Sequence, residues 1–223
     1  MTTDHLTITP SVLYFGTPVA LLSTENEDGS FNLAPMSSAW ALGQVIVLGL
    51  GKDSQTAHNL ATHPDLVINL PEPAQWPAVE RLAPLTGRDP VPAHKQGAFR
   101  YEPAKFEAAG LRPEPSETVR PPRVASCPIQ LEARAARVQP DVTGEFRVIE
   151  AHVLRVHADP RIVVPGTQHV DPAAWSPLIY RSAGQCSGLQ ARGVKARAGV
   201  PARARACLHP QVTVGVAAAR CTA

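Results

Sequence analysis

Short apolar runs separated by turn residues dominate the first part of the chain. The run PVALLST (18–24) is followed by the turn sequence NEDG (26–29) and by FNL (31–33). Apolar runs on either side of such a turn predict a β-hairpin. The run VIVLGL (45–50) is short and continuous, which predicts a strand buried on both sides.

The next segments predict a helix and another strand. Asp53 or Ser54 offers an N-cap, apolar residues at helical spacing follow, and Pro64 ends the segment. This pattern predicts a helix over about 54–63. The run LVINL (66–70) then predicts a strand.

A second short helix is expected over 74–83, with Pro77 in its first turn. Residues 84–123 contain eight prolines and predict an irregular segment with at most one short helix, near 105–109. We call residues 84–123 the excursion. Irregular segments of this length commonly cover a functional site.

The later part of the body returns to strands. Apolar and polar residues alternate strictly over 127–135, which predicts a half-buried strand. Residues 145–157 are also strand-like, and their alternation changes phase near 148–149, as at a β-bulge. Residues 172–180 predict a helical turn or two. The total of six or seven short strands and few helices predicts a mainly β, mostly antiparallel barrel.

Composition supports this fold class. The chain has 223 residues, of which 44% are hydrophobic, so it can bury a full core and is not mainly disordered. It has 23 prolines and 15 glycines, a share that favours short strands and turns over an all-helical bundle.

The net charge of +2 is an average over two unlike parts. Residues 183–223 carry six basic side chains and no acidic ones, which leaves 15 basic against all 19 acidic residues in 1–182. We therefore expect a domain over 1–182 and a basic low-complexity tail over 183–223. The tail is a disordered appendage, a nucleic-acid or membrane-surface arm, or a stretch read out of frame. Its charges are spread singly without aromatic residues, which argues against the arm and against a nucleic-acid partner.

The sequence also bears on location and metals. The first residues lack a secretory pattern, and the uncharged stretch 29–51 is interrupted by polar residues and glycines, so neither export nor a membrane span is expected. Cys127, the one body cysteine, predicts a small core residue in a cytoplasmic protein. The other three, in the tail, form no C-x2-C pair, and the eight histidines show no ligand spacing, so no metal site is expected.

Two stretches carry the candidate chemistry. NLAPMSSAW (32–40) combines small residues and a proline, which leave backbone groups free to read the polar edge of a planar heterocycle. GKDSQTAHN (51–59) places a lysine and hydroxyls beside a helix N-terminus, which is a favourable binding site for a phosphate. Asp53 opposes an anion there unless its side chain serves as a cap.

These stretches, in their order and spacing, resemble the flavin reductase-like FMN-binding split-barrel family. The resemblance covers about residues 11–181 and includes DGSFNLAPMSSAW, KDSQTAHNL, VINLP and VDPAAWSPLIY. It implies a six-stranded antiparallel barrel with Greek-key features, a homodimer, and one FMN per subunit near the dimer interface. The resemblance ends after Tyr180, and Phe146-Arg147 stand where relatives often have a histidine.

The resemblance also implies which residues contact FMN. The isoalloxazine ring would be lined by Asn32, Ala34, Pro35, Met36, Ser37 and Ser38. The phosphate would be held by Lys52, Ser54, Gln55 and Thr56, and Asn69 would lie near the ring or ribityl chain. Read without the resemblance, the serines and threonine are ordinary turn and cap residues, and Trp40 is expected to be a core residue.

The implied activity is an oxidoreductase in which NAD(P)H gives a hydride to the flavin N5 and an unidentified small-molecule acceptor takes the electrons. Because the cofactor supplies the reactive atoms, no catalytic protein side chain is expected. The alternative is a flavin-binding electron carrier or partner-binding module without turnover. Glu117, Arg120 and Arg123, at the end of the excursion, meet either cofactor phosphates or solvent.

Overall fold

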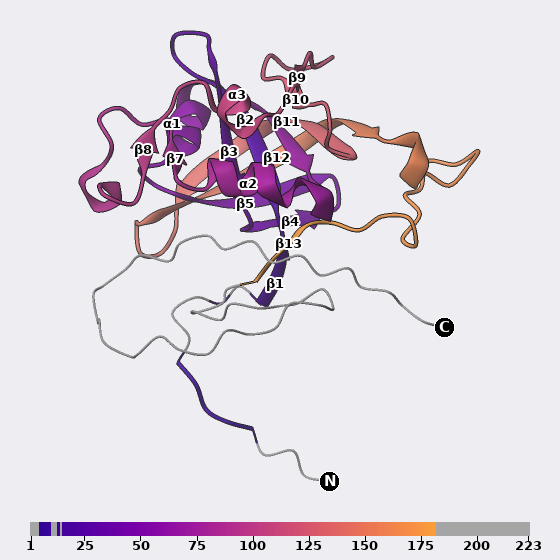
Figure 1. Cartoon of the computed structure of the whole chain (residues 1–223), viewed down its shortest axis with the longest axis horizontal. Helices are drawn as coiled ribbons and strands as arrows, with labels where there is room; N and C mark the ends of the chain where they lie inside the picture. Colours follow the sequence, from indigo (N-terminus) through magenta and orange to yellow (C-terminus); the bar gives the residue numbers. More distant parts are fainter. Residues whose placement is uncertain (1–4, 10–12, 14, 182–223) are drawn as a thin grey trace.

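The computed structural model describes residues 5–9, 13 and 15–181 (Figure 1). Its main body is a seven-stranded antiparallel sheet with the order β3-β2-β6-β11-β12-β5-β4. These strands are β2 (Ala20–Glu25), β3 (Phe31–Met36), β4 (Ala39–Leu42), β5 (Val45–Gly51), β6 (Asp65–Leu70), β11 (Ile129–Pro140) and β12 (Phe146–Ala158). The prediction of a mainly β, antiparallel protein is confirmed.

The two edge strands of this sheet, β3 and β4, are separated along the chain only by Ser37 and Ser38. An open flat sheet of seven strands would hold its edges roughly 29 Å apart, whereas the short link spans about 10 Å. The sheet must therefore curl until its edges meet, which makes it a barrel. The Gly49 amide on β5 donates to the Ser38 carbonyl at 2.8 Å and holds the link against the sheet.

The remaining strands and helices lie outside the seven-stranded sheet. Three pairs of short strands are β1 (Phe15–Pro18) with β13 (Ile179–Arg181), β7 (Leu85–Thr86) with β8 (Arg100–Tyr101), and β9 (Pro113–Glu114) with β10 (Arg123–Val124). The helices are α1 (Gln55–Thr62), α2 (Trp76–Leu82) and α3 (Lys105–Ala109), with 3-10 turns η1 (Pro73–Gln75), η2 (Ala93–Lys95) and η3 (Pro160–Ile162). The helices predicted over 54–63, 74–83 and 105–109 are confirmed within a residue or two, including Pro77 in the first turn of α2.

Two hydrophobic clusters lie on opposite faces of β2. Leu22 packs with Leu48, Ile68 and Ile149 inside the barrel. Leu21, the next residue back, packs with residues of α2 and the 109–127 region on the outer face. Neighbouring strand residues point to opposite faces, so β2 is buried on both sides. Cys127 belongs to the outer cluster, as predicted, and burial raises the pKa of its thiol to about 12.

The predicted hairpin is confirmed, because β2 and β3 pair antiparallel from Ala20 with Met36 to Glu25 with Phe31. The prediction for β5 is wrong in one respect. Only Leu48 and Leu50 are buried, and the other apolar residues of the strand are half-buried, because a barrel wall turns one face toward the core and the other outward. Trp40 on β4 is 61% exposed, so its predicted core position is wrong in the single chain.

The long hairpin of β11 and β12 corrects the predicted bulge. Its register skips Leu154 on β12 and Ala136 on β11, whereas residues 148–149 pair regularly. The apparent change of phase arose because Phe146 and Val148 are apolar on the outer face, Phe146 being 53% exposed, whereas Ile149 on the inner face is fully buried. Apolar character therefore did not mark the inner face at this end of the strand.

The half-buried character predicted for 127–135 is also corrected. Gln130 and Glu132 lie on the face assigned to solvent, yet both are buried. The end of the excursion lies over this face, because the amides of Glu117 and Thr118 donate to Glu132 at 2.9 and 2.6 Å. The end of the excursion, which is distant along the chain, therefore buries side chains that the alternation of the strand alone would place in solvent.

The prediction of a helical turn or two over 172–180 is confirmed only at its start, where the amides of Ala174 and Trp175 donate to the Asp171 carbonyl, and is wrong for the rest. Residues 172–174 form a turn, and Ile179–Arg181 is strand β13, which pairs with β1. The sequence expectations for the tail, including its three cysteines, lie outside the described residues. None of the helices in the described part of the chain has the length and apolar character needed to cross a bilayer.

Candidate functional site

The two stretches singled out in the sequence meet at a side-chain contact between β3 and α1. The Asn32 amide group on β3 donates to the Thr56 hydroxyl in the first turn of α1, with Nδ2 and Oγ1 3.1 Å apart. Both residues are at least 98% buried. The remaining predicted ring-lining residues run from here along β3 to the Ser37-Ser38 link.

The start of α1 presents free backbone donors. Ser54 is the N-cap, and its hydroxyl accepts from the Ala57 amide at 3.1 Å. The amides of Gln55 and Thr56 have no acceptor among the residues that the structure describes. Free N–H groups and the helix dipole make this end of α1 favourable for an anion. Since Ser54 is the cap, Asp53 is not used in that role.

Lys52, the predicted phosphate ligand before α1, already has a carboxylate partner. Its Nζ lies 2.7 Å from Oε1 of Glu145, and this hydrogen bond raises the pKa of Lys52. Asp53 next to it lies 3.9 Å from Nδ1 of His94 in the excursion. Lys52 can reach an anion at α1 only by sharing or leaving Glu145.

Three cations of the excursion interact with one another, because Lys95 interacts with both Arg88 and Lys105. Lys95 also interacts with Asp53, just before α1. We call Arg88, Lys95 and Lys105 the cation group. Lys105 on α3 is only 3% exposed, and its ammonium has no hydrogen-bond partner in the described part of the chain. Burial, together with the charge of Lys95, lowers the pKa of Lys105 to about 8. Burial also lowers the pKa of Lys95, which interacts with Asp53 and Arg88.

The sequence reasoning missed Lys105, although a signal was present. Lys105 stands four residues before Ala109, so both residues lie on one face of α3, and both are buried. A lysine on the apolar face of a short helix signals a buried charge. Desolvating an ammonium without a carboxylate partner is unfavourable, and an anionic ligand would remove that penalty.

Asn32 carries a second unsatisfied group. Its Oδ1 is buried and has no hydrogen-bond donor within the described ranges. Gly87 of the excursion lies directly against it, because a Cβ added to Gly87 would come within 2.7 Å of Oδ1 and 3.0 Å of Cγ of Gln55. Glycine at position 87 thus lets the excursion approach β3 and α1 closely.

The remaining predicted residues occupy more ordinary positions. Ala34, Pro35 and Met36 complete β3, and Met36 packs partly against the inner cluster. Asn69 on β6 is fully buried, with Nδ2 donating to the Leu21 carbonyl and Oδ1 accepting from the Val124 amide. The amide of Asn69 is therefore engaged within the protein, and its proximity to a ligand stays a prediction.

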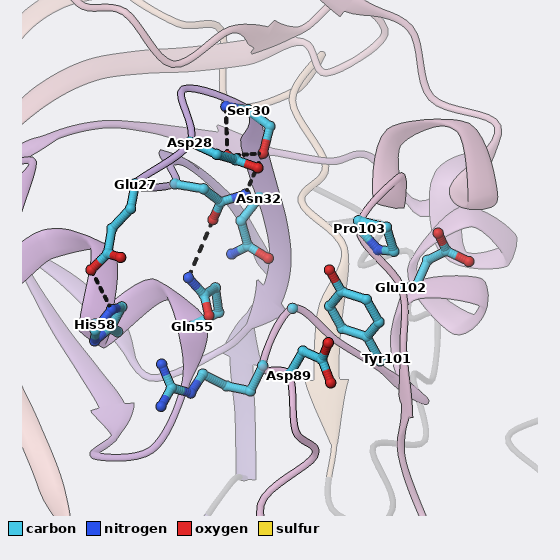
Figure 2. A pocket seen from close by; sticks show the side chains of 13 residues that line it. Glu27, Asp28, Ser30, Asn32, Gln55, His58, Asp89, Tyr101, Glu102 and Pro103 are labelled. Carbon is cyan, nitrogen blue, oxygen red and sulfur yellow. Dashed lines mark hydrogen bonds and ion pairs between the residues drawn. The ribbon is translucent and has the colours of Figure 1, made fainter.

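A pocket of about 370 Å³ opens beside Asn32, between the β2–β3 turn, α1 and the excursion (Figure 2). Gln55 lines it from α1 and Tyr101 from the excursion, and the figure shows both side chains facing the gap next to Asn32. Four carboxylates lie in its lining, namely Glu27, Asp28, Asp89 and Glu102. The pocket is thus acidic, in contrast to the adjacent cation group.

The charged residues at the end of the excursion are held by the protein itself. Arg120 binds both carboxylate oxygens of Glu25 at 2.9 Å, and Arg123 donates to the Pro115 carbonyl. Glu117 accepts from Arg155 at 2.6 Å. In the described part of the chain, no cluster of three or more metal-binding side chains occurs.

The chain belongs to the family of proteins with a flavin reductase like domain, whose model matches residues 12–188. A Bacillus subtilis protein, described as uncharacterized protein YdfE, is 44% identical over 175 residues, which are 78% of this chain and 84% of that protein. The family-level resemblance expected from the sequence is confirmed.

Solved structures of similar fold support the same architecture. Flavoredoxin of Desulfovibrio vulgaris (Miyazaki F) matches with a TM-score of 0.65 at 18% identity, covering 85% of this chain and 99% of flavoredoxin. Nitrilotriacetate monooxygenase component B from Bacillus cereus matches with a TM-score of 0.63 at 18% identity, covering 84% and 100%. The NADH:FAD oxidoreductase SgcE6 of Streptomyces globisporus C-1027, in complex with NAD and FAD fragments, matches at 0.54 and 14% identity, covering 78% and 89%.

Proposed function

We propose that the protein binds FMN and acts as an NAD(P)H-dependent oxidoreductase of the flavin reductase type. The observation that carries this proposal is Lys105, a buried ammonium without a hydrogen-bonded carboxylate, which interacts with Lys95 and through it is linked to Asp53 just before α1. A desolvated cation beside a helix N-terminus is suited to the phosphate of a nucleotide cofactor. Membership of the flavin reductase-like family makes a flavin the appropriate nucleotide.

The residues present fit FMN in two parts. The amides of Gln55 and Thr56, the Ser54 region and the cation group would hold the phosphate, with Lys52 contributing if it leaves Glu145. The Asn32 carboxamide and the backbone of 34–38 would read the polar edge of the isoalloxazine ring. Asn69 would support the wall behind the ring. The unsatisfied Oδ1 of Asn32 is an acceptor for a ligand N–H or O–H.

When bound, FMN would supply the hydride-accepting N5 and pass electrons to an acceptor. The protein's part is then to bind and orient, and no acid, base or nucleophile of the chain is assigned to catalysis. The excursion covers the site through Gly87 and the cation group and would exclude water from it. The acceptor is a small molecule in this proposal.

We also propose a homodimer that forms through β4. Trp40 and Leu42 on this edge strand are 61% and 67% exposed, and they lie on the same face of the strand. Exposed aromatic and leucine side chains on one strand face are typical of protein interfaces. The dimer would bring a second chain next to the Ser37-Ser38 link.

Three further parts of the proposal come from the sequence. The flavin-binding unit is residues 1–182, followed by the separate tail 183–223, and the protein acts in the cytoplasm. Cys127, which is free and buried, is compatible with a reducing compartment.

The test is a flavin titration followed by rapid mixing. Purified full-length protein is expected to take up about one FMN per chain and to lose its visible flavin absorbance when mixed anaerobically with NADH or NADPH. Uptake without bleaching by either donor would favour an electron carrier or partner-binding module. Absence of FMN uptake would contradict the proposal, and the Lys105→Met variant serves as the matched control for binding through the cation group.

A further inference from the structure

The acidic pocket of Figure 2 and the cation group share a boundary. Arg88 and Asp89 are consecutive and both line the pocket, and Arg88 also interacts with Lys95. Glu102 lines the pocket and interacts with Lys105. A ligand that lies across this boundary would meet cations at one end and carboxylates at the other.

Several polar groups of the pocket are unused. The Asp89 carboxylate and the Tyr101 hydroxyl form no hydrogen bond with any described residue. The Tyr101 ring is 44% exposed, so one of its faces is available for stacking. By contrast, Glu27 and Asp28 are engaged with His58 and Ser30.

These groups define the chemistry of an occupant. The free Asp89 carboxylate accepts hydrogen bonds and repels phosphate, so the bound part is rich in N–H and O–H donors and lacks negative charge. An exposed tyrosine ring suits a planar base. Adenosine has an amino group, a planar base and two ribose hydroxyls, and a pocket of about 370 Å³ is large enough to hold it.

We propose that this pocket binds the adenosine half of a dinucleotide whose ribose hydroxyls are free. Tyr101 stacks on the base, Asp89 accepts from the ribose hydroxyls, and the pyrophosphate lies toward the cation group. A carboxylate that accepts from the ribose 2′-hydroxyl disfavours a 2′-phosphate. The site therefore takes NADH in preference to NADPH, or takes FAD in preference to FMN; both sources present the same adenosine.

The naming of the dinucleotide rests on the proposed function, but the binding test does not. Isothermal titration of the full-length protein with AMP measures binding of the adenosine unit directly. Affinity is expected to fall about tenfold or more in Asp89→Asn and in Tyr101→Leu. Both positions are exposed, so the variants should fold. Glu107→Gln, which removes an exposed carboxylate on α3 outside the pocket, is expected to bind AMP like the wild type.

A second titrant tests the acidic character of the pocket. Adenosine 2′,5′-bisphosphate is expected to bind at least tenfold more weakly than AMP. Equal binding of the two nucleotides, unchanged AMP affinity in both variants, or no AMP binding at millimolar concentration would overturn the inference. Protein that takes up FMN but not AMP would contradict this inference alone, whereas protein that binds AMP but no flavin would contradict the proposed function alone.

Two further arms identify the source of the adenosine. If FAD binds about tenfold more tightly than FMN and Asp89→Asn removes that advantage, the adenosine belongs to FAD. If the two flavins bind alike, KM for NADH should be lower than for NADPH, and Asp89→Arg should reverse the order. Failure of both arms would show that no dinucleotide uses the pocket.

Discussion

Glu132 on β11 and His157 on β12 form a close contact, with Oε1 and Nε2 2.7 Å apart. Glu132 is fully buried and also accepts from the amides of Glu117 and Thr118 and from the Thr118 hydroxyl. These contacts fasten the end of the excursion to the barrel. Burial acts to raise the pKa of Glu132, but the hydrogen bonds outweigh it and hold the pKa at about 2.

The first prediction is that acid destabilises the fold through Glu132. Because its folded pKa of about 2 lies below the ordinary 4.5, its ionised form contributes stability above pH 4.5 that is lost as the pH falls toward 2. A shift of this size corresponds to a contribution on the order of 3 kcal/mol. Urea unfolding at a series of pH values measures it.

The matched variants for this experiment are Glu132→Gln and Glu107→Gln. Glu132→Gln is expected to be less stable at neutral pH and to lose much of the stability change between the two pKa values. Glu107→Gln, which alters an exposed carboxylate, should follow the wild type. An unchanged pH dependence in Glu132→Gln would contradict the assignment.

The second prediction concerns Lys105. Replacement by methionine is expected to weaken FMN binding about tenfold or more, while the apo protein stays as stable or becomes more stable, because a desolvated charge is removed. Flavin fluorescence titration and urea unfolding of the same preparation measure the two effects. Loss of stability without loss of affinity would show that Lys105 is structural.

The pH dependence of FMN binding gives a third prediction. The Lys105 pKa of about 8 lies below its ordinary 10.5, so the free site loses this positive charge as the pH rises through 8. FMN affinity should therefore fall above pH 8. The same titration of Lys105→Met should be flat in this range, and a parallel decline in the variant would assign the effect to another group.

The fourth prediction is that a side chain at position 87 destabilises the fold. In Gly87→Ala the new Cβ would lie 2.7 Å from Oδ1 of Asn32, and relief requires the excursion to move away. We expect a loss of about 1–3 kcal/mol in the free energy of unfolding. Gly51→Ala is the control, because a Cβ there meets nothing within 4 Å. Equal stabilities of the two variants would contradict the close approach.

The fifth prediction tests the β4 interface. Trp40→Ser is expected to raise the dimer dissociation constant about tenfold or more, since interface tryptophans commonly contribute 2 kcal/mol or more. Sedimentation of the wild type and the variant over a range of concentrations measures it. Val142→Ser, which alters a fully exposed apolar residue at a loop, is the control. Wild-type protein that sediments as a monomer at all concentrations would contradict the dimer.

The elements that the sequence predicted well are those with strong local signals. The β2–β3 hairpin is specified by its turn residues, and α1 by Ser54 and Pro64 at its ends. The wrong predictions depend on distant contacts. Glu132 looked solvent-facing because period-two alternation cannot show that Thr118 will cover it, and β13 looked helical because its partner β1 lies at the other end of the chain.

The candidate site was predictable in the same uneven way. Asn32 and Thr56 were both named from the sequence, and their side chains are in contact. Lys105 on α3 carried a local signal of a buried charge, but Arg88 and Lys95 lie in parts of the excursion without periodic pattern, so the position of these two cations could not be predicted. The excursion can approach Asn32 and Gln55 closely only because residue 87 has no side chain. No pattern in the sequence distinguishes this glycine from an ordinary loop glycine.

Pro35 has a consequence for how copies of this protein meet. It lies in β3, an edge strand, and pairs with Leu21 without a backbone N–H to donate. A proline on an edge deprives an incoming strand of a ladder hydrogen bond. Strand-to-strand growth into fibrils is therefore hindered along β3, and association is left to side-chain contacts such as those that Trp40 can make on β4, the strand that follows it.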